Sequence, residues 1–221
     1  MPPAKQPLTR ATPIEDRAPE VIRRLSKAYP GAKVALRFSN PLEILVATIL
    51  SAQCTDAKVN EVTQALFKKY QTPQDYLKVP EDELKADIKP TGFYNQKAIS
   101  VREACRRIVE VYGGTVPSTM QELMTLRGVA RKTANIVMGN GFGTVEGIAV
   151  DTHVKRLANR IGFSAESDPD KIEQDLCRLI PRAKWFPFSY VLIDHGRAIC
   201  QAKKPRCAEC PIEDLCPSSQ V

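Results

Sequence analysis

Apolar residues recur at helical spacing through nearly every segment after residue 19, and the strict alternation typical of strands is absent. In the segment 55–70 one face collects Val59, Val62, Leu66 and Tyr70. The segment 95–114 carries a similar stripe and stops at two glycines. This pattern predicts an all-α fold, and the short connections favour antiparallel packing of neighbouring helices.

Further helices are predicted at 42–53, 119–125, 131–139, 152–161, 169–180 and 188–199. The first of these is nearly all apolar, as a helix buried on most sides would be. Residues 1–19 differ from the rest because they contain five prolines and no helical or strand period. They are predicted to form a disordered N-terminal arm.

The net charge of +7 allows a nucleic-acid partner without requiring one. The excess is concentrated in residues 1–40, which carry eight Lys or Arg against three acidic residues. The longest strongly apolar run, 44–50, is far shorter than the roughly 18 to 20 residues of a membrane span. No secretion signal opens the sequence, so we expect a cytoplasmic protein whose thiols stay reduced.

Four of the seven cysteines follow the spacing C-x6-C-x2-C-x5-C, with no histidine between them. They are Cys200, Cys207, Cys210 and Cys216. Reduced thiols at this density favour a metal over disulfides, and the spacing alone leaves zinc and an iron-sulfur cluster open. The other three, Cys54, Cys105 and Cys177, lie in helical patterns and are expected to pack as small apolar residues.

Two further motifs precede the cysteines, "LRGVARKTANIVMGN" at 126–140 and "VDTHVKRLANR" at 150–160. Together with the cysteine spacing, and in this order, they resemble the endonuclease III family of DNA glycosylases over about residues 20 to 217. The resemblance implies a helix-hairpin-helix, a downstream aspartate and a 4Fe-4S cluster held by the four cysteines. It also implies a helical barrel at 38–148, an iron-sulfur lobe combining 20–37 with 149–221, and DNA bound between the two lobes.

The resemblance makes Lys132 and Asp151 the catalytic residues. A lysine is normally protonated and then is no nucleophile, but the helix N-terminus, the adjacent Arg131 and desolvation by DNA would all favour the neutral amine. The amine could then attack a deoxyribose C1′ and form a Schiff base, while the carboxylate stabilises positive charge on the sugar. On sequence alone, Lys132 also fits a solvated surface lysine, and Asp151 fits a helix N-cap.

Residues that contact DNA follow from the same resemblance. The hairpin turn is expected to bind phosphate through Arg127, Gly128, Val129, Ala130 and Arg131. In the family this turn usually reads Leu-Pro-Gly-Val-Gly, so Arg127 and Ala130 are departures, and Ala130 can begin a helix without positive φ.

Other contacts are expected outside the turn. Gln53 and Phe93 would fill the space left by an extruded base, although the family member known best has leucine in place of Phe93. His153 could line the pocket or be an ordinary packed histidine, and the loop 201–206 would present Lys203, Lys204 and Arg206 to phosphates.

The resemblance implies a monomeric, nucleoid-associated enzyme of base excision repair. It would be a bifunctional DNA glycosylase and AP lyase that removes oxidised pyrimidines from double-stranded DNA and cleaves the abasic site by β-elimination. The alternatives are a monofunctional mismatch glycosylase, which would typically lack a lysine at the hairpin, a non-enzymatic DNA-binding iron-sulfur protein, and a zinc-bound regulator.

Overall fold

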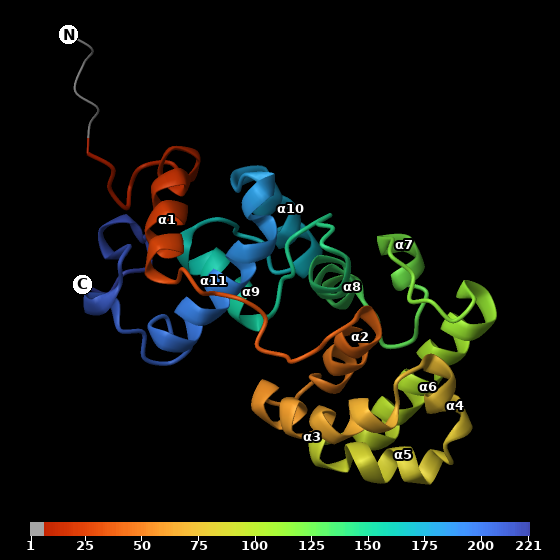
Figure 1. The fold of residues 1–221 in the computed structure, drawn as a ribbon. Helices are drawn as coiled ribbons and strands as arrows, with labels where there is room; N and C mark the ends of the chain where they lie inside the picture. The colour runs from red at the N-terminus through yellow and green to blue at the C-terminus, as the bar shows by residue number, and fades with distance from the viewer. Residues whose placement is uncertain (1–6) are drawn as a thin grey trace. The chain divides into compact units, whose positions relative to one another are not determined.

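A computed structural model of the protein describes residues 7–221 (Figure 1). Within that range all regular structure is helical, which confirms the predicted all-α fold. The chain forms two compact units, one from residues up to 33 together with 147–221, and the other from 34–146. The unit boundaries therefore lie at 33/34 and 146/147, against predicted boundaries at 37/38 and 148/149. Every helix within residues 7–221 is too short or too polar to traverse a bilayer.

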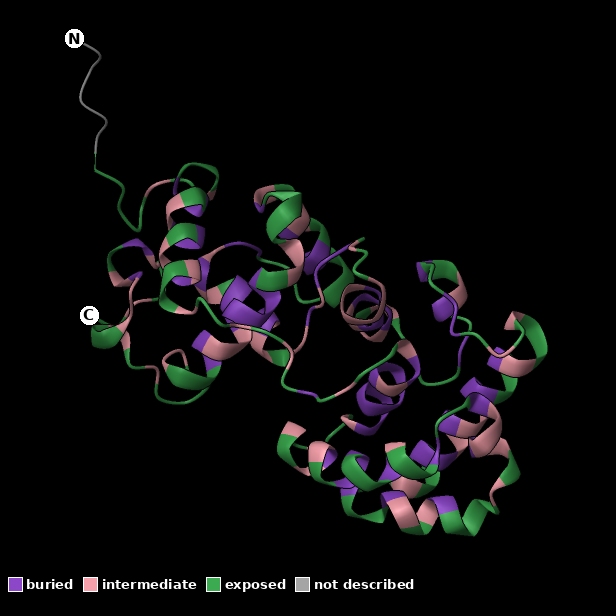
Figure 2. Ribbon diagram, viewed as in Figure 1, coloured by how far each residue is buried: buried purple, intermediate pink, exposed green. Residues whose placement is uncertain are grey.

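The contiguous unit, 34–146, is a helical domain built around α2. It contains α2 (Pro41–Leu50), α3 (Asp56–Lys69), α4 (Pro73–Lys78), α5 (Glu81–Ile88), η1 (Lys89–Thr91), α6 (Tyr94–Tyr112), α7 (Met120–Leu123), α8 (Arg131–Val137) and the π-turn η2 (Met138–Phe142). Helix α2 packs against α3, α6 and α8. Eight of its ten residues are buried, as its apolar sequence predicted (Figure 2).

Local sequence sets the ends of these helices. Asn40 caps α2 by accepting a hydrogen bond from the Glu43 N–H at 3.0 Å, and Pro41 occupies the first helical position, where no N–H is needed. Thr55 caps α3 in the same way. At the C-terminal end of α6, Gly113 ends the helix in the left-handed conformation, with φ of +61°.

The discontinuous unit contains α1 (Ile14–Ala28), α9 (Thr152–Ile161), α10 (Pro169–Leu179), η3 (Arg182–Lys184), α11 (Trp185–Ala198), η4 (Cys207–Glu209) and η5 (Glu213–Leu215). Helix α9 packs against α10 and α11, and α1 packs against α11. Its core is formed by apolar residues of all four α-helices, joined by Ile212 and Leu215 from the cysteine-rich segment.

The predicted disordered arm, 1–19, needs correction. Residues 1–6 lie outside the described residues, but Ile14 to Pro19 form the first turns of α1. Pro19 removes one helical hydrogen bond, and this loss is offset because α1 buries Val21, Ile22 and Leu25 on one face. Tertiary packing therefore outweighs the proline content of this segment.

Candidate functional site

The helical hairpin consists of α7, a tight turn and α8. The Leu126 N–H donates to the Leu123 carbonyl and the Val129 N–H donates to the Leu126 carbonyl, at 3.0 and 3.1 Å. Gly128 has φ of +82°, and a Cβ there would lie 3.0 Å from the Ser100 Cβ of α6. This position therefore requires glycine for both its backbone conformation and its close approach to α6.

The structure divides the five predicted turn residues into two groups. Arg127, Gly128 and Ala130 are exposed and Arg131 is half-buried, whereas Val129 is buried in the core. The Val129 N–H is already used within the turn. Ala130 has φ of −91°, so helix α8 begins without a left-handed residue, as predicted.

Lys132 is exposed at the second position of α8. The N-cap of this helix is Ala130, whose side chain accepts no hydrogen bond, whereas Asp151 and Asp168 cap α9 and α10. The positive end of the α8 dipole is thus not neutralised by an acidic cap. A cationic side chain and an uncapped helix start together favour an anionic ligand at this turn.

Asp151 is the half-buried N-cap of α9, in the discontinuous unit. Its Oδ1 accepts a 2.8 Å hydrogen bond from the Val154 N–H, which fixes the orientation of the carboxylate. His153, two residues on, is half-buried, and its Nδ1 lies 3.1 Å from Nη2 of Arg156. The capping role that the sequence predicted for Asp151 is therefore present, and it holds the carboxylate rigidly.

Gln53 and Phe93 share an unusual backbone conformation. They have φ of +52° and +48°, and they are the two non-glycine residues with positive φ in the described part of the chain. Both are exposed, and 64% of the Phe93 surface is accessible to solvent. Strained residues of this kind persist where the surrounding structure fixes them, and they are concentrated at functional sites.

The four clustered cysteines are half-buried and line one common cavity. Burial raises the pKa of the Cys210 thiol to about 11 and also raises the pKa of Cys216, so their deprotonation calls for nearby positive charge. Within residues 7–221, no three His, Cys, Asp or Glu side chains form a group that could hold a single metal ion.

Two of the sulfurs have side-chain nitrogens close to them. Arg160 Nη1 lies 3.4 Å from Cys200 Sγ, and His195 Nε2 lies 3.5 Å from Cys210 Sγ. Four thiols around one cavity, with a guanidinium N–H directed at the Cys200 sulfur, fit an iron-sulfur cluster. The remaining cysteines pack against the two cores, with Cys105 buried and Cys54 and Cys177 half-buried.

Helix α9 holds the loop between the first two cluster cysteines. Arg160 donates to the carbonyls of Gln201 and Ala202, both at 2.7 Å, and Arg156 donates to those of Gly196 and Cys200. These two arginines were not predicted as site residues, although their i, i+4 spacing places both on one face of α9.

The loop itself carries the three predicted phosphate-binding cations. All three are exposed, and Arg206 also donates hydrogen bonds to the Glu209 carboxylate and to the Ala198 carbonyl. Arg206 is therefore held by residues on both sides of the loop, and Lys203 and Lys204 are the other exposed cations of the loop.

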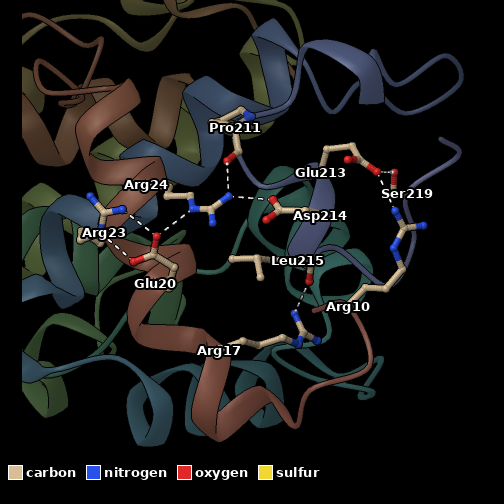
Figure 3. Close-up of polar contacts among 10 residues, drawn as sticks. All are labelled: Arg10, Arg17, Glu20, Arg23, Arg24, Pro211, Glu213, Asp214, Leu215 and Ser219. Carbon is tan, nitrogen blue, oxygen red and sulfur yellow. Dashed lines mark hydrogen bonds and ion pairs between the residues drawn. The ribbon is translucent and has the colours of Figure 1, made fainter. Parts of the chain in front are cut away.

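Helix α1 and the segment before it hold the other end of the cysteine-rich segment (Figure 3). Arg17 donates to the Leu215 carbonyl at 2.9 Å, next to Cys216, and Arg24 pairs with Asp214 at 2.7 Å. Arg10 pairs with Glu213 at 2.7 Å. Residues 213–215 are thus tied to the N-terminal segment by three arginines.

The sequence matches known families over both units. Residues 46–182 match the HhH-GPD superfamily of base excision DNA repair proteins, and residues 200–216 match the iron-sulfur binding domain of endonuclease III. The latter range begins and ends at Cys200 and Cys216, the first and fourth of the closely spaced cysteines. The endonuclease III of Synechocystis sp. (strain ATCC 27184 / PCC 6803 / Kazusa) is 50% identical over 94% of either chain.

Solved structures show the same similarity. A non-covalent endonuclease III–DNA complex has a TM-score of 0.89 and 42% identity, and the match covers 93% of this chain and 96% of that one. A trapped endonuclease III–DNA covalent intermediate has the same TM-score and identity, over 93% of this chain and 97% of that one.

Proposed function

This chain belongs to the endonuclease III family of HhH-GPD superfamily base excision DNA repair proteins, and we propose that it removes oxidised pyrimidines from double-stranded DNA with Lys132 as the nucleophile. Its activity is that of a bifunctional DNA glycosylase and AP lyase, and its cofactor is a 4Fe-4S cluster. The observation that carries the proposal is an exposed lysine at the start of α8 in a chain that is 42% identical to an endonuclease trapped covalently on DNA.

In the proposed reaction, the neutral Nζ of Lys132 attacks C1′ of the damaged nucleotide, and the glycosidic bond breaks with its electron pair going to the departing base. The ring then opens to a Schiff base. Loss of a C2′ proton shifts electrons toward C3′ and expels the 3′ phosphate, which cleaves the strand. Water finally hydrolyses the Schiff base and regenerates the amine.

Asp151 acts as the carboxylate that stabilises positive charge on the sugar while the base departs, and it assists deprotonation of the amine. Its hydrogen bond to the Val154 N–H supports this role, because a capped carboxylate needs little reorganisation during the reaction. Electrostatic stabilisation by a fixed group of this kind is typically worth about 3 to 4 kcal/mol.

We propose Cys200, Cys207, Cys210 and Cys216 as the ligands of the cluster. When bound, the cluster supplies four iron–thiolate bonds that crosslink residues 200–216. Arg156 and Arg160 of α9 hold the loop carbonyls, and this leaves Lys203 and Lys204 exposed for phosphate.

The proposed DNA contacts are shared among the exposed loops. Gln53 and Phe93 enter the duplex where the damaged base leaves the stack, since an amide can replace lost base-pair hydrogen bonds and a ring can stack. The hairpin turn binds phosphate through Arg127, Arg131 and the backbone of Gly128 and Ala130. The protein acts as a monomer on damaged or abasic DNA, at the nucleoid.

Borohydride trapping on abasic duplex DNA tests the nucleophile. The wild type and Lys171→Ala should form a covalent adduct and nick the strand, and Lys132→Ala should do neither. Lys171 is a matched control because it is also an exposed lysine in the first turn of a helix, α10. An adduct formed by Lys132→Ala at the wild-type rate would refute the assignment.

The substrate class needs a second assay, a panel of modified bases in duplex DNA. Release of oxidised pyrimidines with strand nicking is expected. Release of a normal mismatched base without nicking by the wild type would favour the monofunctional alternative.

A further inference from the structure

The loops that carry Gln53 and Phe93 meet at one buried cation. Lys97, on the first turn of α6, is 4% exposed, and its Nζ donates to the carbonyls of Leu50 and Thr91, both at 2.7 Å. Leu50 is the last residue of α2 and lies three residues before Gln53. Thr91 is the last residue of η1 and lies two residues before Phe93.

A third contact ties the same residue to the second loop. The backbone N–H of Lys97 donates to the Phe93 carbonyl at 3.1 Å. Thr91 is itself buried, and its hydroxyl donates to the Ile88 carbonyl at 2.8 Å. The start of each exposed loop is therefore fixed by hydrogen bonds to the interior, while the tips at Gln53 and Phe93 face solvent.

Burial of an ammonium is costly and is retained only where its hydrogen bonds are satisfied. Desolvation lowers the pKa of Lys97, so its charged form depends on the two carbonyls that it binds. Each carbonyl lies at the end of a helix, where the helix itself supplies no donor. Lys97 is thus the shared partner of two helix ends that are separated by about forty residues of chain.

We propose that Lys97 is a positioning residue that sets the spacing between the two inserting loops, so that Gln53 and Phe93 enter the DNA together. The proposal rests on the proposed function and deepens it. The strained residues Gln53 and Phe93 can enter DNA readily only if the chain segments that carry them are already rigid. Otherwise two independent loops would have to be ordered on binding, at a cost in conformational entropy. Lys97 removes that cost before DNA arrives, without touching the DNA.

A matched control is available on the same helix. Arg102 is also partly buried on α6, and it donates to the carbonyls of Tyr76, Leu77 and Val79, which belong to α4 and its C-cap and to neither inserting loop. Lys97→Met and Arg102→Met both remove carbonyl hydrogen bonds from this domain. Only the first should affect extrusion.

The test compares single-turnover base release from a fully paired duplex with release of the same lesion from a single strand, which needs no extrusion. Lys97→Met should lower the duplex rate relative to the single-strand rate by about tenfold, and Arg102→Met should leave this ratio unchanged. The fluorescence of a 2-aminopurine placed next to the lesion should rise more slowly on binding of Lys97→Met than on binding of the wild type.

If Lys97→Met does not fold, Lys97→Gln retains a shorter donor and should lower the same ratio to an intermediate value. Equal ratios for the Lys97 and Arg102 variants would overturn the inference while leaving the proposed function intact. Absence of any base release or abasic nicking by the wild type would instead overturn the proposed function.

Discussion

Replacing Arg17 with methionine should destabilise the discontinuous unit and release its cluster. Arg17 is 4% exposed, and it donates to the carbonyls of Thr12, Ile161 and Leu215 at 3.0, 2.7 and 2.9 Å. A hydrogen bond from a charged group contributes about 1.5 to 3 kcal/mol net. Burial opposes the charged form and lowers the pKa of Arg17, so part of this gain is offset.

The expected loss for Arg17→Met is about 3 kcal/mol, because the carbonyls of Ile161 and Leu215 remain buried without their donor. With a urea dependence of about 3 kcal/mol per molar, this loss shifts the unfolding midpoint down by about 1 M. Unfolding is followed by far-ultraviolet circular dichroism, and cluster retention by visible absorbance and iron content. The variant should lose its iron at a lower urea concentration than the wild type does, because Leu215, which loses its hydrogen bond, adjoins Cys216.

Arg23→Met is the matched control on the same helix. The Arg23 side chain is 60% exposed and pairs with Glu20, so its loss should leave the unfolding midpoint close to that of the wild type. If Arg17→Met retained iron and unfolded at the same urea concentration as Arg23→Met, the reasoning from buried carbonyls would be refuted.

Two further predictions concern the helix cap Asp151 and the half-buried carboxylate of Glu20. Asp151→Asn should keep the α9 cap, whereas Asp151→Ala should lose about 1 kcal/mol of stability. Both variants should lose base release. Full activity in Asp151→Asn would mean that capping is the only role of this side chain. Hydrogen bonds from two arginines of α1 lower the pKa of Glu20 from 4.5 to about 2, so its stabilising effect is present above pH 4.5 and is lost as the pH falls toward 2. The melting temperature of the wild type should therefore fall toward that of Glu20→Gln across this range, and a constant difference would contradict the assignment.

The sequence predicted most helices because each carries an apolar stripe and a recognisable stop. Helices α2, α3, α6, α9 and α10 lie within a few residues of their predicted ranges. Helix α11 begins at Trp185, before the predicted 188, because Pro187 is tolerated in a first turn. The first turns of α1, from Ile14 to Pro19, were not predicted, because the proline content of residues 1–19 indicated disorder. The helix is stabilised by packing of its apolar face in the core, which local sequence does not show.

The grouping of the four cysteines could be predicted from their spacing, and in the structure all four line one cavity. Lys97 has no such signal, since a lysine within an amphipathic helix is usually a solvated residue. Its burial depends on two carbonyls from distant helices, Leu50 and Thr91. The left-handed conformation of Gln53 and Phe93 was equally hidden, because neither residue type favours positive φ.

The discontinuous unit imposes an order on biosynthesis. A nascent chain emerging from the ribosome completes residues 34–146 while α1 still lacks α11, its packing partner, so the contiguous domain can fold first. More than a hundred further residues are synthesised before the partners that cover the apolar face of α1 are made. With the four ligands proposed above, the cluster can be held in full only after Cys216 is translated, which makes its insertion a late step; the contacts of Arg17 and Arg24 with residues 214–215 then form last as well.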